Sequence, residues 1–249
     1  MTKRDVIGRY KGSIMGLMWS FINPATLLTI YTLVFSIVFK ARWGSGEPES
    51  KTQFALLLFT GMIIHSLFSE PLMRAPSLIT CNVNYVKKII FPLEILAVVA
   101  VGASVFQALV SVLVLAAALF LFNGYIPLTA LFLPLVLMPL IIFSLGVTWA
   151  LSSLGVYLRD VGQPIGLVIT FLLFGSPVFY PSSALPDYLQ PWLILNPLTF
   201  IIEQTRVVMI FGNPPYAFGL LVYSLISLLA AWTGYAWFQK TRRGFGNVL

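Results

Sequence analysis

Charged side chains are scarce in this sequence. Asp, Glu, Lys and Arg make up only 9% of the 249 residues, whereas 59% are hydrophobic and the mean hydropathy is +0.93. Because soluble domains carry about 25% charged residues, this composition excludes a soluble globular protein. The sequence instead indicates an all-α integral membrane protein with six transmembrane helices of about 20 residues each and no room for a separate soluble domain.

Metal ligands and nucleophiles are also few. The chain has one cysteine, Cys81, and one histidine, His65, which excludes a disulfide framework and leaves too few ligands for a transition-metal site. The pattern G-x-x-x-x-G-K-[S/T], which cradles nucleotide phosphates, does not occur. We therefore expect no catalytic residue, no metal and no cofactor in this chain. If the protein moves a substrate uphill, a partner subunit must bind the ATP and Mg²⁺.

The excess of bases, which gives a formal net charge of +7, does not indicate a nucleic-acid partner. The bases are dispersed between apolar runs, so we assign them to membrane topology, in which cytoplasmic segments hold most Lys and Arg. With both termini in the cytoplasm, the inside bases are Lys3, Arg4, Arg9, Lys11, Arg74, Lys87, Lys88, Arg159, Lys240, Arg242 and Arg243, and the outside ones are Lys40, Arg42, Lys51 and Arg206.

Residues 1–16 predict an amphipathic helix that lies in the membrane interface. Val6, Ile7, Tyr10 and Ile14 recur at helical spacing and would share one apolar face, while the basic residues lie off that face. A basic helix of this kind rests among lipid headgroups rather than crossing the bilayer. The apolar run that follows is too long for a signal peptide and lacks a small-residue cleavage site, so we expect a retained first span.

The predicted spans cover residues 17–39, 54–73, 93–122, 128–158, 164–180 and 216–238. Between the second and third spans, residues 74–92 are bounded by prolines and predict one or two short cytoplasmic helices. Residues 181–215 are too apolar for an ordinary loop, and Asn196-Pro197 divides them into two segments that are too short to span. We predict a re-entrant helix pair in the outer leaflet, before the last span.

His65, Ser69 and Glu70 lie close together on the second span and could be imagined as a nucleophile with its base. A packing histidine and serine, with Glu70 paired to Arg74 one turn on, explain the same residues without chemistry. We favour the structural interpretation.

Several stretches resemble one family. The matching residues are Arg9-Tyr10-Lys11, Gly16, Trp19 and Pro24, then Lys87-Lys88-Ile89-Ile90-Phe91-Pro92, Arg159-Asp160, Ser176-Pro177-Val178-Phe179-Tyr180, and Asn196-Pro197-Leu198 with Glu203 and Arg206. Their order and spacing are similar to the membrane subunit of type-2 ABC transporters that export polysaccharides, namely the O-antigen, capsule and teichoic-acid permeases.

The resemblance implies a homodimer of six-span subunits with two copies of a separate ATPase, which together move a lipid-linked polysaccharide across the bacterial cytoplasmic (inner) membrane. The few lysines and the many Ala, Leu and Val residues favour a GC-rich, Gram-negative host and hence O-antigen. A type-2 permease for drugs, lipids or teichoic acid is the alternative. An intramembrane enzyme acting on lipid-linked sugars is the more remote one.

The resemblance also implies roles for individual residues. The ATPase would couple to the inner loops, here through Lys87, Lys88, Arg159 and Asp160. The residues that would attract the lipid pyrophosphate are Arg4, Arg9, Lys11, Lys87 and Lys88, unless these bases serve only the topology.

Five aromatic residues could line the passage, where their rings would offer apolar faces to the CH faces of sugars. They are Phe35, Phe59, Phe68, Phe171 and Phe174. In lipid-facing positions the same residues need no functional explanation.

Overall fold

The computed structural model describes residues 1–9, 13, 15–34, 51–83, 91–186, 188 and 190–249. In this part of the chain the protein is all-helical and contains no strand, which confirms the predicted class. The α-helices are α1 Thr2–Arg9, α2 Trp19–Tyr31, α3 Lys51–Leu78, α5 Glu94–Asn123, α6 Leu133–Tyr157, α7 Gly162–Phe174, α8 Gln190–Leu195, α9 Pro197–Met209, α10 Ala217–Thr241 and α11 Phe245–Val248. Short 3₁₀ turns are η1 Gly16–Met18, η3 Thr80–Asn82, η4 Leu128–Phe132, η5 Arg159–Val161, η6 Ser182–Ala184 and η7 Arg242–Gly244.

Four of the described helical segments are long and apolar enough to cross a bilayer. They are Thr52–Leu78, Glu94–Asn123, Leu128–Tyr157 and Ala217–Gly244. The first and fifth predicted spans correspond to α2 and α7, which have 13 residues each and are shorter than the roughly 20 residues a span requires. The structure therefore supports four spans, and the count of six stays a prediction.

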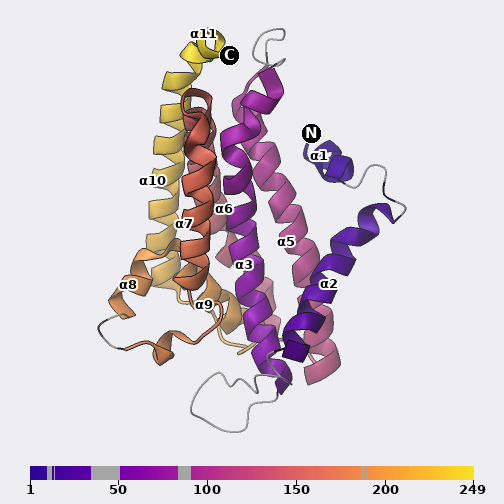
Figure 1. Ribbon diagram of the computed structural model, residues 1–249. Helices are drawn as coiled ribbons and strands as arrows, with labels where there is room; N and C mark the ends of the chain where they lie inside the picture. The colour runs from indigo at the N-terminus through magenta and orange to yellow at the C-terminus, as the bar shows by residue number, and fades with distance from the viewer. Residues whose placement is uncertain (10–12, 14, 35–50, 84–90, 187, 189) are drawn as a thin grey trace.

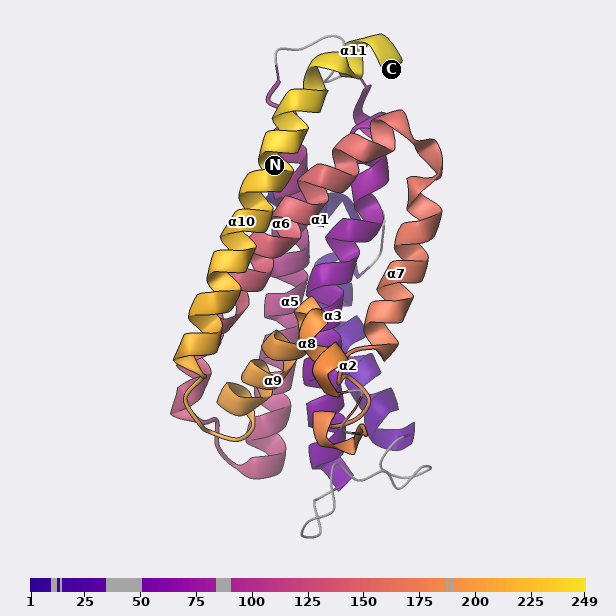
Figure 2. The ribbon, with the colours of Figure 1, turned by 90° about the vertical axis from the view of Figure 1, so that its left-hand side faces the viewer.

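The chain runs up and down between two ends (Figures 1 and 2). One end, here called the N/C end, holds both termini with α1, η3, η5 and α11. The opposite end holds α8 and α9, the two short helices that sequence analysis predicts between residues 181 and 215. Helix α7 lies at one side of the bundle (Figure 2), and α2 diverges from the bundle toward the N/C end (Figure 1).

The predicted helix over residues 1–16 ends early. Helix α1 stops at Arg9, and Ser13 and Met15 are non-helical. Gly16 has a φ of +51°, a left-handed conformation that only glycine adopts readily, and its N–H bonds to the Ser13 carbonyl in a turn. The prediction of one continuous interfacial helix over residues 1–16 was therefore wrong, because this turn separates α1 from α2. The membrane depth of α1 stays a prediction.

Helix α3 is longer than the second predicted span. The prolines Pro71 and Pro76 lie inside it, and it continues to Leu78, so residues 74–78 belong to this helix rather than to a separate cytoplasmic one. Interior prolines are tolerated where neighbouring helices cover the freed backbone groups. Gly155 of α6 lets the two helices approach closely at this point, since a Cβ built there would collide with the Pro76 backbone.

Two glycines bring α6 and α10 into backbone contact. A Cβ built on Gly146 would lie 2.5 Å from the Ala230 carbonyl oxygen, and one built on Gly234 would collide with the Gly146 carbonyl. Small residues at such crossings let membrane helices gain dispersion energy over a long seam. Helices α6 and α10 accordingly form the most extensive helix pair in the described structure.

Replacing Gly146 tests this seam. The variant Gly146→Ala is expected to lower the free energy of unfolding by about 1–3 kcal/mol, because the added Cβ forces the two backbones apart. Gly166→Ala is the matched control, since a Cβ there has nothing within 4 Å, and it should stabilise α7 by about 0.5–1 kcal/mol. Thermal unfolding of the purified protein in detergent measures both, and equal midpoints for the two variants would contradict the packing.

Candidate functional site

A buried arginine organises the end opposite the termini. Arg206 of α9 is 3% exposed and is the only Asp, Glu, Lys or Arg among the buried residues of the described chain. Its Nε and Nη2 donate to the Leu57 carbonyl of α3 at 3.1 and 2.9 Å. Its Nη1 donates to the Pro177 carbonyl at 2.7 Å, and Nη2 also reaches the Val178 carbonyl at 3.2 Å. The guanidinium thus joins α9 to α3 and to the turn that follows α7.

Two of the stretches that carry the family resemblance meet around this arginine, namely Ser176-Pro177-Val178-Phe179-Tyr180 and Asn196-Pro197-Leu198. Asn196 caps α9, with its side-chain oxygen accepting from the Leu198 N–H at 2.9 Å, and its amide donates to the Leu172 carbonyl of α7 at 3.3 Å. Space for the guanidinium comes from Gly61 of α3, where a Cβ would lie 3.1 Å from both Arg206 Nη2 and Val178 Cα. Sequence analysis missed Gly61, because a helical glycine in an apolar run gives no signal until its neighbour is known.

A second site lies at the N/C end, where α1 packs beside α5. Arg74 of α3 and Asp5 of α1 form a bidentate ion pair, in which both N–O distances are 3.0 Å. Sequence analysis paired Arg74 with Glu70 and did not foresee Asp5, which is distant in the chain. These residues line a pocket of about 460 Å³, together with Arg4 and Asn82.

Of the five bases predicted to attract a lipid pyrophosphate, the structure places one in this pocket. Arg4 is exposed and lines its wall. The side chains of Arg9, Lys11, Lys87 and Lys88 lie outside the described residues. Arg74 is a base of the same pocket that sequence analysis did not propose.

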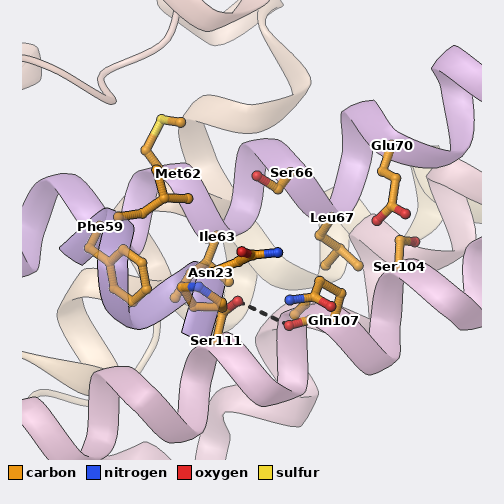
Figure 3. A pocket seen from close by; sticks show the side chains of 13 residues that line it. Asn23, Phe59, Met62, Ile63, Ser66, Leu67, Glu70, Ser104, Gln107 and Ser111 are labelled. Atoms are coloured by element: carbon orange, nitrogen blue, oxygen red, sulfur yellow. Dashed lines mark hydrogen bonds between the residues drawn. The ribbon is translucent and has the colours of Figure 1, made fainter. Parts of the chain in front are cut away.

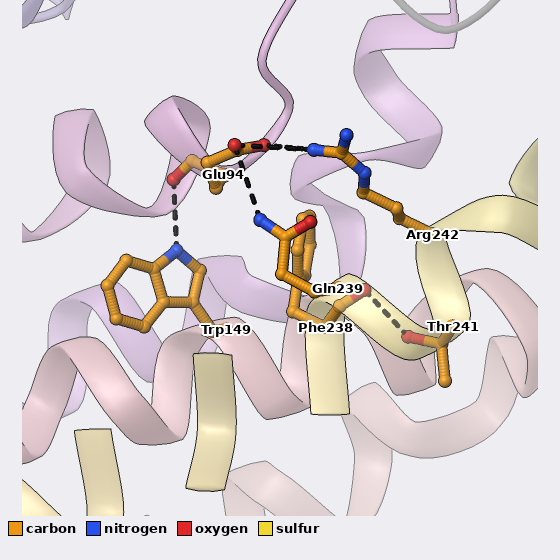
Figure 4. Close-up of polar contacts among 6 residues, drawn as sticks. All are labelled: Glu94, Trp149, Phe238, Gln239, Thr241 and Arg242. Carbon is orange, nitrogen blue, oxygen red and sulfur yellow. Dashed lines mark hydrogen bonds and ion pairs between the residues drawn. The ribbon is translucent and has the colours of Figure 1, made fainter. Parts of the chain in front are cut away.

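Polar contacts tie three helices together at the N/C end (Figure 4). Glu94 of α5 accepts from Arg242 at 3.0 Å and from Gln239 at 3.3 Å, and its backbone carbonyl accepts from the Trp149 indole of α6 at 3.0 Å. Phe238 packs in the apolar cluster directly beneath. The N/C ends of α5, α6 and α10 are therefore held as one unit.

The predicted coupling residues Arg159 and Asp160 lie in η5, the turn between α6 and α7, and both are exposed. Arg159 also lines a groove of about 540 Å³ between the N/C end of α3, this turn and the C-terminus. The other two coupling candidates, Lys87 and Lys88, lie outside the described residues.

The predicted channel aromatics fall into two groups. Phe59 and Phe68 are each 3% exposed inside the bundle, where Phe68 stacks on Phe143. Phe171 and Phe174 are 74% and 63% exposed on α7. Phe35 lies outside the described residues. Of the four candidates that the structure describes, only the α7 pair is therefore exposed.

The contact of His65 agrees with the structural interpretation of this residue. The His65 Nε2 lies 3.4 Å from the Ile169 carbonyl of α7, at a helix-packing contact. Arg74 is bound to Asp5, as described above. No group of three or more His, Cys, Asp or Glu that could hold a metal ion occurs in the described chain.

These features define a class: a helical membrane protein with several bilayer-crossing segments and a polar, basic N/C end. The family model for ABC-2 type transporters matches residues 1–210, so the chain belongs to this family. Membership makes it the membrane subunit of a transporter rather than an enzyme, and it implies an ABC ATPase as partner.

Three curated relatives match most of the chain. The O-antigen export system permease protein RfbA of Myxococcus xanthus is 23% identical over 251 residues, covering 100% of this chain and 94% of the relative. An RfbA of Klebsiella pneumoniae is 25% identical over 250 residues, covering 100% and 93%. The polysialic acid transport protein KpsM of Escherichia coli is 22% identical over 241 residues, covering 95% and 90%.

Arg206→Lys is expected to weaken the end opposite the termini, because one ammonium cannot reach carbonyls on three sides. Losing two or more charged hydrogen bonds should cost about 3 kcal/mol or more, seen as a lower unfolding midpoint in detergent. Arg243→Lys, at an exposed position on η7, makes the same chemical change and should leave the midpoint unchanged. Equal midpoints would show that the guanidinium geometry is dispensable.

The Asp5–Arg74 pair joins α1 to α3 and should thereby keep α1 packed on the neighbouring α5. A Cβ on Gly102 would lie 3.6 Å from the Thr2 Cβ, a spacing that suits a disulfide. With Cys81 replaced by serine, Thr2→Cys with Gly102→Cys should therefore cross-link in membranes. Asp5→Arg should lower the yield by opposing Arg74, and adding Arg74→Asp should restore it. A yield independent of both charges would contradict the role of the pair.

Proposed function

We propose that the protein is the permease subunit of an exporter that moves a lipid-linked polysaccharide, of the O-antigen kind, out across the cytoplasmic membrane. The observation that carries the proposal is the similarity to O-antigen export permeases, which extends over 100% of this chain and 93–94% of those relatives. The absence of a nucleotide-binding pattern in the sequence agrees with ATP hydrolysis by a separate partner.

We place the N/C end in the cytoplasm. Arg4, Arg159, Lys240, Arg242 and Arg243 lie at this end in the structure, as the positive-inside rule requires of a cytoplasmic face. The ATPase would dock there, on the groove beside η5 and on the exposed Arg159 and Asp160. Because α5, α6 and α10 are held together at the same end, a displacement of η5 by the ATPase would be transmitted to these three helices as one rigid unit.

The pocket that Arg4 and Arg74 line would receive the pyrophosphate of the lipid carrier. Two guanidinium groups against the single carboxylate of Asp5 leave the pocket with an excess of positive charge. A guanidinium binds phosphate through paired hydrogen bonds, and a surface pocket of bases attracts anionic headgroups. The neighbouring bases Arg9, Lys11, Lys87 and Lys88 would add to the same field.

The passage would form between two copies of the chain. Helix α7 packs mainly on α3 and leaves an exposed apolar face that includes Leu167, Phe171 and Phe174. In a homodimer this face would border a path for the glycan. Ring faces there would touch the CH faces of successive sugars weakly enough to let the chain slide.

Replacing two aromatic residues tests the proposal in cells. Deleting the gene for this chain should abolish surface polysaccharide while lipid-linked material accumulates inside. The wild-type gene should restore export, and Phe171→Ala with Phe174→Ala should restore roughly a tenth or less of it, as expected when two stacking contacts of about 1 kcal/mol each are lost. Electrophoresis of surface polysaccharide with a carbohydrate stain measures the output.

Leu225→Ala with Leu229→Ala is the control, because these α10 side chains are 59% and 61% exposed and should face lipid. That double variant should export normally at equal protein level. Normal surface polysaccharide in the deletion strain would refute the proposed function. Normal export by the aromatic variant would remove only α7 from the path.

A further inference from the structure

The ion pair between Asp5 and Arg74 occupies part of the pocket that is proposed to receive a pyrophosphate. Both Nη atoms of Arg74 donate to the Asp5 carboxylate, at 3.0 Å each, so the outer edge of the guanidinium fork is filled. The same edge suits a phosphate group, which it would hold through two parallel hydrogen bonds. The carboxylate of the pocket and the incoming ligand therefore compete for the same donors.

Asp5 is the one acidic residue in the lining of this pocket, among the residues that the structure describes. Glu70 precedes Arg74 by one helical turn, but it lines a separate crevice between α2, α3 and α5, together with Ser104 (Figure 3). An anion that approached Arg74 beside Asp5 would be repelled by the carboxylate. Entry of a pyrophosphate against Arg74 thus requires Asp5 to leave.

The ion pair lies where it can open. The side chains of Arg74 and Asp5 are 36% and 25% exposed, so water can solvate both groups once they part. Separating such a pair costs much less than separating one that is sealed in a core. Arg74 belongs to the long helix α3, whereas Asp5 belongs to α1, which has eight residues and little helical stability of its own. Asp5 is therefore the partner that moves.

Arg4 offers the anion a second partner. It precedes Asp5 in α1, is exposed, and lines the same pocket. A pyrophosphate carries more charge than a carboxylate and has one phosphate group for each of the two guanidinium groups. Placed between Arg4 and Arg74, it would replace Asp5 as the link between α1 and α3.

We infer that Asp5 is an internal competitor, which holds Arg74 in the empty pocket and is displaced by the diphosphate group of the ligand. The identity of this ligand rests on the proposed function. Asp5 lowers the affinity of the pocket for the diphosphate, because only the fraction of molecules with an open ion pair can bind it. A carboxylate that returns to Arg74 also hastens release, which a site on a transport path requires.

Pyrophosphate binding to the purified full chain in nanodiscs tests the inference. Asp5→Asn should bind radiolabelled inorganic pyrophosphate about tenfold more tightly than the wild type, which corresponds to an ion pair that is formed for about nine-tenths of the time. Asp5→Glu keeps a carboxylate and should bind like the wild type. If Asp5 served only to position α1, Asp5→Asn would displace Arg4 and weaken binding, so the two roles predict changes of opposite sign.

The gain in affinity should depend on Arg74. In an Arg74→Gln background, which should itself bind pyrophosphate weakly, Asp5→Asn should change the affinity by about threefold or less. Glu203→Gln removes the same charge at the opposite end, on α9, and should leave the affinity unchanged. Asp5→Ala, which favours the helix, takes the place of Asp5→Asn if that variant does not fold.

Competition by farnesyl pyrophosphate identifies the source of the diphosphate. Displacement of the label at a much lower concentration than unlabelled pyrophosphate requires would identify a lipid headgroup, and equal competition would identify a soluble diphosphate. Either result supports the role of Asp5 if Asp5→Asn binds more tightly. Unchanged or lower affinity in Asp5→Asn, no binding by either protein, or binding that Arg74→Gln leaves intact would overturn it. A failed proposed function would show separately, as surface polysaccharide in the deletion strain.

Discussion

The buried Arg206 guanidinium is the interaction on which the far end of this protein depends. Four hydrogen bonds join its Nε, Nη1 and Nη2 to backbone carbonyls of α3 and of the turn after α7, so one side chain links both elements to α9. Removing the guanidinium would deprive the backbone carbonyls of Leu57, Pro177 and Val178 of a charged donor and would leave a cavity in its place. Helix α9 keeps its position against the bundle because this one residue binds both α3 and the turn after α7.

Much of the fold could be predicted from the sequence, because apolar length and charge placement report directly on membrane segments. The helices α5, α6 and α10 begin and end close to the predicted bounds, and Asn196-Pro197 divides the two short helices as expected. The prediction of a continuous helix over residues 1–16 was wrong, because α1 ends at Arg9 and a turn with a left-handed Gly16 precedes α2, although the apolar periodicity looks continuous. The predicted end of the second span was wrong for the opposite reason, since α3 continues past Pro76, where it packs closely against Gly155 of α6.

The sites were less predictable, since they depend on which residues meet. Arg206 was visible in the sequence, but only as one of the residues that carry the family resemblance. Its actual partners are carbonyls, and carbonyls carry no sequence signal. The pairing of Asp5 with Arg74 joins the first helix to the third, and no local pattern encodes it. The exposure of Phe171 and Phe174 could be recognised only once the structure had placed α7 at the side of the bundle.

The glycine seam between α6 and α10 has a consequence for motion. Two backbones in direct contact cannot slide without a clash, and the Glu94–Arg242 ion pair pins the same assembly at its base. Helix α10 therefore stays fixed relative to α6, although only 17% of its most apolar 18-residue stretch is buried. Any widening of the bundle must therefore come from α2 and α7. These helices pack through side chains, which can change rotamer and separate.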